Sequence, residues 1–405
     1  MKPLTFMLIA GEPSGDLLAS ELVRALRVES SEAGWGLTTD AQPLKAGLEP
    51  RFIGAGGPQM AAAGVELAFD LTAHAVIGVS DVLKNIGKFR RLFHELLNLA
   101  VQRQPDAIVC VDFGGFNRRF GHAAKAYTRA HRGWFHDWDP KLVQLVSPQV
   151  WASRAGRAYS MARDFDLLLS IFPFEKAWYA QRVPEFRVEF VGHPMVDRFS
   201  PATVPSADLS PSAVPASPRV VLLPGSRPAE LRRHLPVMLG ALTLIRVAFP
   251  QVTASMVLPH QRLLDQAQAV GLPPELQARV GGLAAELERA DLAIAKTGTT
   301  TMECAFFGVP TVALYKETLL TYQVGRRIVK VKYLSMPNIL ADAPIFPEFI
   351  QNAATPENLA GAAIELLRDP RRRAEVKVRL AGIVASLGGP GAARRGAQAI
   401  MRLLG

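Results

Sequence analysis

Short apolar runs alternate with longer amphipathic segments along most of the chain. Each run is followed by glycine, proline or a polar residue, which predicts buried strands that end in turns. In the first half, the predicted strands are 4–10, 51–54, 107–111, 142–146, 167–172 and 188–191. In the second half, strands at 219–223, 253–258, 291–295 and 311–314 alternate with helices at 228–248, 261–270 and 283–289. This alternation predicts an α/β fold of two doubly wound, Rossmann-like domains.

One segment without apolar periodicity divides the chain. Residues 200–218 are almost wholly Ser, Ala, Pro and Val, which is typical of an interdomain linker. The predicted domains are therefore 1–199 and 219–387. Residues 388–405 begin with a glycine-rich break and end in a helix. This helix could fold back over either domain, and the N-terminal domain is the one that we favour. Because ligands of doubly wound domains lie at the carboxyl ends of the strands, we expect a ligand-binding cleft between the domains.

The composition is that of a globular protein with an anionic partner. Of 405 residues, 49% are hydrophobic and 20% charged, and the formal net charge is +10. A phosphorylated substrate or a membrane surface suits this charge, whereas no recognition-helix, zinc-finger or RNA-binding signature supports a nucleic acid. Cys110 and Cys304 lie in apolar runs and are expected to be reduced core residues. The first apolar run is too short for a signal peptide, and no stretch approaches the length of a membrane span.

The segment 79–100 has a helical apolar stripe on one face and basic residues on the other. Its apolar positions are 79, 82, 83, 86, 89, 93, 96, 97 and 100. A core-facing helix explains this pattern, and so does a helix that rests on an anionic membrane. The residues that would face the membrane are Val79, Val82, Leu83, Ile86, Phe89, Lys84, Lys88, Arg90 and Arg91.

Polar turns follow several of the predicted strands. Gly-Ser-Arg at 225–227 opens a helix, where free N–H groups, the helix dipole and a guanidinium together suit a phosphate. The turns at 11–16 and 296–300 occupy the same place after their own strands, and Asp112 ends a further strand. An ordinary strand-to-helix turn with a solvated side chain is the structural alternative for each of them.

Two other motifs are assigned to loops. Asp137-Trp138-Asp139 has a metal-binding pattern, but it precedes a predicted strand, whereas such a pair is expected just after one. Residues 54–57 resemble a dinucleotide-binding glycine loop, but Gln59 stands at the position of the third glycine.

Taken together, these turns resemble the lipid-A-disaccharide synthase family of inverting glycosyltransferases, which has the two-domain GT-B fold. The resemblance runs along nearly the whole chain, through AGEPSGD at 10–16, FIG at 52–54, Asp112 with Phe116-Asn117, VSP at 146–148, PFEK at 173–176, VGH at 191–193, LLPGSR at 222–227, Glu303 and Pro337-Asn338. The chain departs from the family's pattern at Gly115, where a second aspartate is usual, at Gln144-Leu145 and at Thr297–Thr300.

The resemblance implies a reaction of lipid A biosynthesis. UDP-2,3-diacylglucosamine would be the donor and 2,3-diacylglucosamine 1-phosphate (lipid X) the acceptor, giving lipid A disaccharide 1-phosphate and UDP. No metal or other cofactor is expected, because Arg227 and the helix ends can offset the charge of the leaving diphosphate. The enzyme would be cytoplasmic and peripheral on the inner face of the inner membrane.

The same resemblance implies roles for individual residues. Asp112 would be the general base that takes the proton from the acceptor's 6-hydroxyl, and its structural alternative is a carboxylate bonded by the Gly114-Gly115 turn. Residues expected to bind the donor are Gly225, Ser226, Arg227, Thr297, Gly298, Thr299, Thr300, Glu303 and Asn338. Residues expected to bind the acceptor are Gly11, Glu12, Ser14, Gly15, Asp16 and Asn117.

Two alternatives remain open on the sequence. One is another GT-B enzyme acting on UDP-GlcNAc, such as a 2-epimerase or a glycan transferase. The other is a non-catalytic protein that binds nucleotide sugars. The basic amphipathic stripe at 79–100 favours a lipid substrate over the first alternative, and the presence of Asp112, Arg227 and Glu303 argues against the second.

Overall fold

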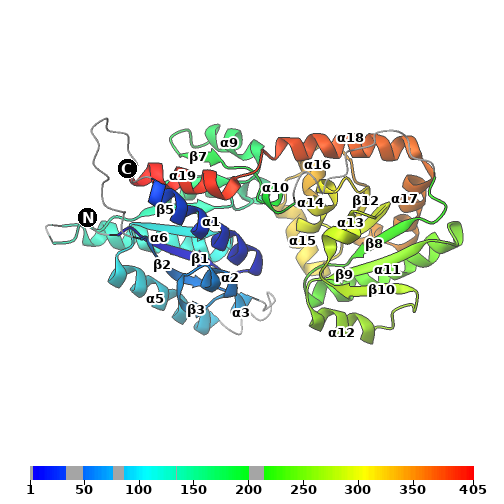
Figure 1. The fold of residues 1–405 in the computed structure, drawn as a ribbon, viewed down its shortest axis with the longest axis horizontal. Coiled ribbons are helices and arrows are strands. Elements are labelled where there is room, and N and C mark those ends of the chain that lie inside the picture. The colour runs from blue at the N-terminus through cyan, green and yellow to red at the C-terminus, as the bar shows by residue number, and fades with distance from the viewer. Residues whose placement is uncertain (1–2, 33–48, 76–85, 134, 200–213) are drawn as a thin grey trace. The chain divides into compact units, whose positions relative to one another are not determined.

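The computed structural model describes residues 3–32, 49–75, 86–133, 135–199 and 214–405. Two compact units make up the chain (Figure 1). The first unit contains Met1–Asp197 and Gly388–Gly405, and the second contains Arg198–Leu387. Most of the predicted linker, 200–213, lies outside the described residues. Each unit is treated by itself below.

The first unit is built on a seven-stranded sheet in which every paired strand is parallel. Its strands are β1 (Thr5–Ala10), β2 (Arg51–Gly56), β3 (Glu66–Asp70), β4 (Ala107–Val111), β5 (Lys141–Leu145), β6 (Leu167–Ser170) and β7 (Val188–Phe190). Their order is β3-β2-β1-β4-β5-β6-β7. All residues of β1 and β4 are buried, as their continuous apolar runs predict for strands covered on both faces.

Helices cover both faces of this sheet, with α1 and α19 on one side and α5 on the other (Figure 1). The helices are α1 (Pro13–Glu32), α2 (Pro58–Ala62), α3 (Thr72–Ala75), α5 (Ile86–Arg103), α6 (Gly114–His131), α7 (Val150–Ser153), α8 (Arg157–Asp164), α9 (Pro173–Ala180), α10 (Met195–Arg198) and α19 (Ala392–Leu404). The last helix packs along α1, where a Cβ on Gly396 would lie 3.5 Å from Leu22 Cδ1. The Asp197 carboxylate accepts the N–H of Ala392 at 2.9 Å and so holds the beginning of α19 on the first unit.

The helix predicted at 79–100 is only partly within the described residues. Val79, Val82, Leu83 and Lys84 fall outside them, and α5 begins at Ile86. Leu96 is fully buried, and Phe93 packs against the core of the unit. By contrast, Lys88, Arg90 and Arg91 are exposed and Phe89 is half-buried. The later turns of α5 therefore face the core, and its first turn carries the exposed basic residues.

The second unit repeats the plan of the first with six parallel strands. They are β8 (Arg219–Leu223), β9 (Thr253–Leu258), β10 (Leu276–Val280), β11 (Leu292–Lys296), β12 (Thr311–Tyr315) and β13 (Glu348–Ile350), in the order β10-β9-β8-β11-β12-β13. Its helices are α11 (Pro228–Ala248), α12 (Gln261–Ala269), α13 (Leu283–Leu287), α14 (Thr299–Phe306), α15 (Leu319–Ile328), α16 (Met336–Ala341), α17 (Pro356–Arg368) and α18 (Pro370–Ser386). The predicted α/β class with two doubly wound domains is confirmed.

The strand orders locate the ligand-binding edges. In the first unit the order reverses between β1 and β4, and in the second between β8 and β11. Doubly wound sheets bind ligands outside the carboxyl ends of strands at such a reversal. The relevant segments are therefore those that follow Ala10, Val111, Leu223 and Lys296, and these are the turns in which the sequence analysis placed its candidates.

Candidate functional site

In the first unit, the chain makes a strained turn directly after β4. Asp112 and Phe113 have φ angles of 48° and 45°, in the left-handed region that residues other than glycine seldom adopt. Two buried amides hold this turn. Asn117 Nδ2 donates to the carbonyl of Asp112 at 2.9 Å and to that of Val111 at 3.1 Å, and Gln144 Nε2 donates to Asp112 O at 3.2 Å. Side chains buried beneath the turn thus stabilise the strained backbone conformation at Asp112.

The carboxyl group of Asp112 is only partly accessible. Burial raises its pKa, the negative charge of Glu12 raises it further, and a hydrogen bond from the Phe113 backbone opposes both. The backbone bond thus comes from Phe113 rather than from the predicted Gly114-Gly115 turn. A carboxylate with a raised pKa is a better proton acceptor, which suits a general base.

The predicted turn at 11–16 is shorter in the structure. Helix α1 begins at Pro13 rather than Leu17, because proline suits the first turn of a helix. Ser14 is exposed, and a Cβ on Gly15 would lie 3.5 Å from the carbonyl oxygen of Val111 at the end of β4. A Cβ on Gly11 would clash with the ring of Phe113, so glycine is needed where the segment after β1 meets the segment after β4.

Two of the predicted acceptor-binding residues form hydrogen bonds within the fold. Asp16 is 2% exposed, and its carboxylate accepts the N–H groups of Gly57, Gln59 and Met60 at 2.8, 2.9 and 3.0 Å, which caps α2. Asn117 is fully buried under the Asp112 turn. The Asp16 carboxylate and the Asn117 amide nitrogen thus bond to backbone groups of the fold, whereas the Oδ1 of Asn117 is buried without a partner within the described residues. That these two side chains bind the acceptor stays a prediction.

A buried polar group lies at the ends of β5 and β6. Glu175 is 1% exposed, and its Oε1 accepts the indole N–H of Trp151 at 3.0 Å. Its Oε2 has no partner within the described residues. Burial raises the pKa of Glu175 to about 7, although the bond from Trp151 opposes the rise. The sequence analysis quoted this glutamate in a motif and assigned it no role.

In the second unit, a carboxylate occupies the turn after β8. Glu230 Oε2 accepts the N–H groups of Ser226 at 2.9 Å and Arg227 at 3.2 Å, and its Oε1 pairs with Lys296 Nζ at 3.0 Å. Gly225 has φ 121°, and a Cβ there would lie 2.5 Å from Glu230 Oε2. A carboxylate of the same helix therefore accepts the N–H groups that were predicted to bind the diphosphate, and diphosphate binding by Ser226 stays a prediction.

The beginning of α14 is open by comparison. Gly298 has φ 153° and, like Thr299, is exposed, whereas Thr297 is 6% exposed and its N–H bonds to Leu314 O at 3.0 Å. Among the described residues, the N–H groups of Thr299 and Thr300 find no acceptor. A Cβ on Gly298 would lie 3.3 Å from Lys296 Nζ, so a cation lies beside this helix end. Of the two anion sites predicted in the second unit, the one at the beginning of α14 therefore has backbone N–H groups that can bind an anion.

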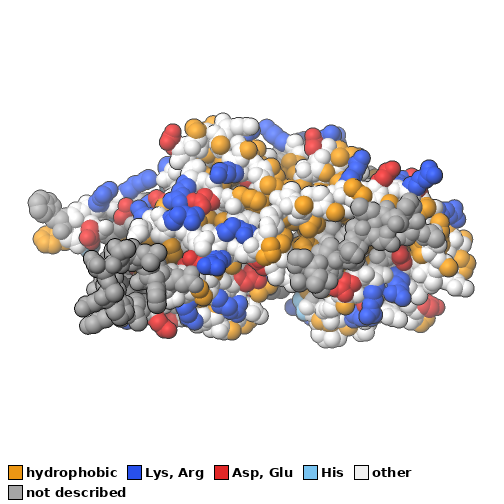
Figure 2. Space-filling model, turned by 45° about the horizontal axis from the view of Figure 1, so that its top comes forward, with side chains coloured by type: hydrophobic (Ala, Val, Ile, Leu, Met, Phe, Trp, Pro, Cys, Tyr) orange, Lys and Arg blue, Asp and Glu red, His pale blue; other side chains and the backbone are white. Residues whose placement is uncertain are grey.

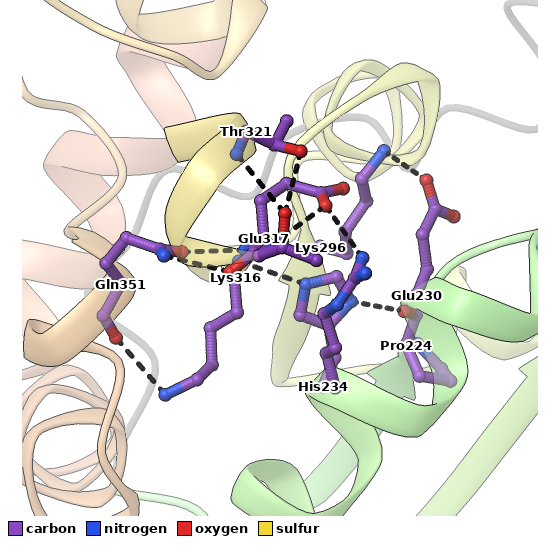
Figure 3. Close-up of polar contacts among 10 residues, drawn as sticks. Pro224, Glu230, His234, Lys296, Lys316, Glu317, Thr321 and Gln351 are labelled. Carbon is purple, nitrogen blue, oxygen red and sulfur yellow. Dashed lines mark hydrogen bonds and ion pairs between the residues drawn. The ribbon is translucent and has the colours of Figure 1, made fainter. Parts of the chain in front are cut away.

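A buried histidine joins the same edge of the sheet (Figure 3). His234 Nδ1 lies 2.9 Å from the carbonyl of Pro224, and the N–H of Lys316 donates to Nε2 at 3.1 Å. Since a carbonyl only accepts and an amide N–H only donates, the proton is on Nδ1 and the ring is neutral. Burial lowers the pKa of His234, although its bond to the Pro224 carbonyl and the negative charge of Glu230 oppose this.

A second layer of bonds ties the ends of β12 and β13 (Figure 3). Gln351 and Glu317 bond to each other twice, at 2.6 and 2.9 Å, and Arg233 pairs with Glu317 at 2.7 Å. Lys316 Nζ donates to the carbonyl oxygens of Gln351 at 3.2 Å and Ala354 at 3.1 Å. The sequence pattern does not reveal this network, since its members lie in α11 and in the segments that follow β12 and β13.

The two remaining donor candidates differ from each other. Burial raises the pKa of Glu303 to about 7, against the opposing positive charge of Arg198. Asn338 is fully buried, donates to Phe346 O and Glu348 Oε1 at 2.8 Å each, and accepts the N–H of Phe346 at 2.8 Å. The amide of Asn338 thus bonds to Phe346 and Glu348 at the beginning of β13, and its predicted role in donor binding stays a prediction.

Residues 6–400 match a family model described as lipid-A-disaccharide synthetase. The chain belongs to the lipid-A-disaccharide synthase family. It is 35% identical over 411 residues to the lipid-A-disaccharide synthase of Geobacter metallireducens, covering 98% of this chain and 97% of that protein. It is 33% identical over 412 residues to the lipid-A-disaccharide synthase of Trichlorobacter lovleyi, covering 100% and 98%.

Solved structures share the fold of this family member. A protein described as UDP-N-acetylglucosamine 2-epimerase from Listeria monocytogenes aligns with a TM-score of 0.61 at 14% identity, covering 100% of this chain and 97% of that one. The spinosyn rhamnosyltransferase SpnG with thymidine diphosphate aligns with a TM-score of 0.55 at 15% identity, covering 99% and 100%. The GT-B fold class predicted from the sequence is confirmed.

Within the described residues, no three His, Cys, Asp or Glu side chains are grouped so that they could hold a metal ion. Asp137 and Asp139 lie in a loop as predicted, and Asp139 contacts Lys125 Nζ at 3.3 Å. None of the described helices has both the length and the apolar character to cross a bilayer.

Proposed function

We propose that the chain transfers 2,3-diacylglucosamine from its UDP derivative to lipid X, giving lipid A disaccharide 1-phosphate and UDP. The family match over residues 6–400 supports the reaction. The observation that carries the mechanism is the strained turn that presents Asp112 at the switch point of the first sheet, with a raised pKa.

The proposed chemistry is a direct displacement with inversion. The acceptor's 6-hydroxyl oxygen attacks the anomeric carbon of the donor, and the bond from that carbon to the diphosphate oxygen breaks. UDP leaves with the bonding electron pair, and the hydroxyl proton passes to the Asp112 carboxylate. The partial burial of Asp112 keeps this carboxylate basic enough to accept the proton.

The donor would bind to the second unit. The open N–H groups of Thr299 and Thr300, with Lys296 beside them, would hold the diphosphate, and Arg227 would add a guanidinium. Glu303, one turn into α14, would accept the ribose hydroxyls. These cationic and N–H groups would stabilise the leaving UDP, so the proposal includes no metal and no other cofactor.

The proposal also places the enzyme in the cytoplasm, bound peripherally to the inner face of the inner membrane. Both of the proposed sugar substrates carry acyl chains, so they reside in or near a bilayer. The exposed Lys88, Arg90 and Arg91 beside the half-buried Phe89 give the beginning of α5 the character of an interfacial helix. The net charge of +10 favours an anionic surface.

The test is a reaction with defined substrates. The purified protein is incubated with UDP-2,3-diacylglucosamine and lipid X in detergent micelles, and UDP release and disaccharide mass are followed together. Equal amounts of UDP and disaccharide are expected. A parallel incubation with UDP-GlcNAc alone tests the epimerase alternative, and conversion of this sugar without disaccharide synthesis would refute the proposal.

A further inference from the structure

Four arginines lie close together at the carboxyl edge of the first sheet. Arg118 and Arg119 are in the second turn of α6, Arg154 follows the end of α7, and Arg157 begins α8. These helices follow β4 and β5, which are neighbours in the sheet. The segment after β4 lies close to the segment after β5, since a Cβ at Gly114 would lie 3.1 Å from the side chain of Pro148.

The surroundings of these side chains are positive. Burial lowers the pKa of Arg157, and the charges of Arg154, Arg118 and Arg119 lower it further, with no carboxylate acting in the opposite direction. Within the described residues, none of the four guanidinium groups forms an ion pair or a side-chain hydrogen bond. The Nε of Arg118 is moreover buried without a partner.

Arg119 and Arg154 are exposed, Arg118 and Arg157 are half-buried, and an anion would stabilise such a cluster. Like charges at short range repel, and a buried guanidinium nitrogen without an acceptor loses its hydration. Other arginines of the same unit have a carboxylate, as Arg163 has Asp164 at 2.8 Å and Arg187 has Glu189 at 2.7 Å. The unpaired cluster therefore has the chemistry of a phosphate site, because guanidinium forks match phosphate oxygens bidentately.

We propose that Arg118, Arg119, Arg154 and Arg157 bind the phosphate monoester of the acceptor sugar. This inference rests on the proposed function and extends it to the group that the enzyme uses to recognise its acceptor. Arg118 directly follows Asn117, whose amide bonds the Asp112 carbonyl at 2.9 Å, so the cluster and the general base share one end of α6. A sugar with its 6-hydroxyl at Asp112 would direct its phosphate toward these arginines.

The experiment compares two acceptors with single arginine variants. Michaelis constants are measured in detergent micelles for lipid X and for the same sugar without its phosphate. Arg118→Ala and Arg157→Ala should raise the KM for lipid X roughly 10- to 100-fold and leave the KM for the dephosphorylated sugar and for the donor unchanged. Arg132→Ala, at the other end of α6 and exposed, is the matched control and should change neither acceptor constant.

Two further measurements keep the inference separate from the proposed function and from folding. Calorimetric binding of lipid X to the donor-free protein reports on the cluster without turnover, and it should weaken in the same two variants. If wild-type protein binds lipid X but makes no disaccharide, and the two variants bind lipid X more weakly, the proposed function fails and the arginine site stands. Arg157→Lys keeps the charge without the fork, so it replaces Arg157→Ala if that variant does not fold, and it should still raise the KM for lipid X.

Three outcomes would overturn the inference. The first is an equal loss of affinity for both acceptors, which would make the arginines general structural residues. The second is unchanged lipid X binding in every variant. The third is unchanged kinetics in micelles with lost binding to phosphatidylglycerol vesicles, which would assign the cluster to a lipid headgroup of the membrane.

Discussion

At the scale of single residues, the structure separates polar side chains that serve the fold from those that remain available. Asp16 and Asn338 use their polar atoms on backbone groups brought from elsewhere in the chain. Asp112 is held differently, since its neighbours bond its backbone carbonyl and leave one backbone contact to its carboxylate. This difference makes Asp112 the residue on which a chemical prediction can be made.

Asp112→Asn should lower turnover roughly 100- to 10,000-fold, because the amide cannot accept the proton. Asparagine tolerates the left-handed conformation that position 112 requires, and it removes the repulsion from Glu12. The melting temperature should therefore stay equal or rise slightly, and calorimetric affinity for UDP should not change. If the variant folds and its turnover is normal, another group is the general base, and Glu12 is the first residue to test.

The raised pKa of Glu175 predicts that the free energy of unfolding depends on pH. Its pKa is about 7 in the folded chain against 4.5 for the ordinary side chain, so the folded state binds more protons between these values. The free energy of unfolding therefore falls as pH rises from 4.5 to 7, by about 3 kcal/mol from this group. Glu175→Gln should flatten the wild-type curve by that amount when urea unfolding is measured at pH 5 and pH 8.

The exposed Glu185→Gln is the control for this measurement, in the same unit. Its free energy of unfolding should follow the wild-type curve at both pH values. Parallel curves for Glu175→Gln and wild type would mean that Glu175 is ionised in the folded protein at pH 5.

At the scale of elements, the sequence predicts the inner strands and the edge strand β7 (Val188–Phe190), and it misses the other three edge strands. β8, α11 and β9 have their predicted bounds, because each carries an unbroken apolar run or a helical stripe between clear end signals. β3, β10 and β13 were missed, since edge strands are half-exposed and alternate with polar residues such as Glu66 and Arg279. Their pairing is decided by neighbours distant in sequence, which periodicity cannot reveal.

Contacts between residues distant in sequence also limit what can be predicted of the candidate site. The sequence predicted the turns at 225–227 and 297–300 as anion sites, and a choice between them required the position of one side chain. Glu230 bends back onto its own helix end and meets Lys296 from the neighbouring strand. The local sequence could not reveal this pair, because Lys296 lies far from Glu230 along the chain.

Glu230→Gln should destabilise the second unit, since it breaks a partly buried pair with Lys296. We expect a loss of about 1–3 kcal/mol at pH 7. Burial alone would raise the pKa of Glu230, but Lys296 and the N–H groups outweigh this and lower it. The contribution of the carboxylate is therefore present above its ordinary pKa and is lost as pH falls through the lowered value.

Chemical unfolding of wild type and Glu230→Gln at pH 7 and pH 3 measures this effect. The difference between the two proteins should shrink in acid. Glu66→Gln removes an exposed pair with Arg103 and serves as the control, with an expected change below about 0.5 kcal/mol. A Glu230 effect no larger than the Glu66 effect would show that the helix end does not depend on this carboxylate.

At the scale of the whole molecule, the excess of positive charge needs an anionic partner. Lys and Arg side chains are spread over the visible face of both units rather than gathered in one patch (Figure 2). Diffuse charge attracts an anionic membrane without orienting the protein on it. Orientation requires apolar side chains beside the basic ones, and the beginning of α5 combines Phe89 with three exposed cations.

Replacing Lys88, Arg90 and Arg91 by glutamate should therefore abolish salt-sensitive binding to phosphatidylglycerol vesicles. Each basic residue near an anionic surface contributes about 1 kcal/mol, so reversing three of them should weaken binding at least 100-fold in a sedimentation assay. The control reverses three exposed arginines of the second unit, Arg289, Arg371 and Arg379, which changes the net charge equally. If both triple variants lose binding alike, net charge alone draws the protein to the membrane and α5 does not orient it. If only the α5 variant loses binding, while its turnover on micellar substrates is kept, α5 is the membrane-facing element.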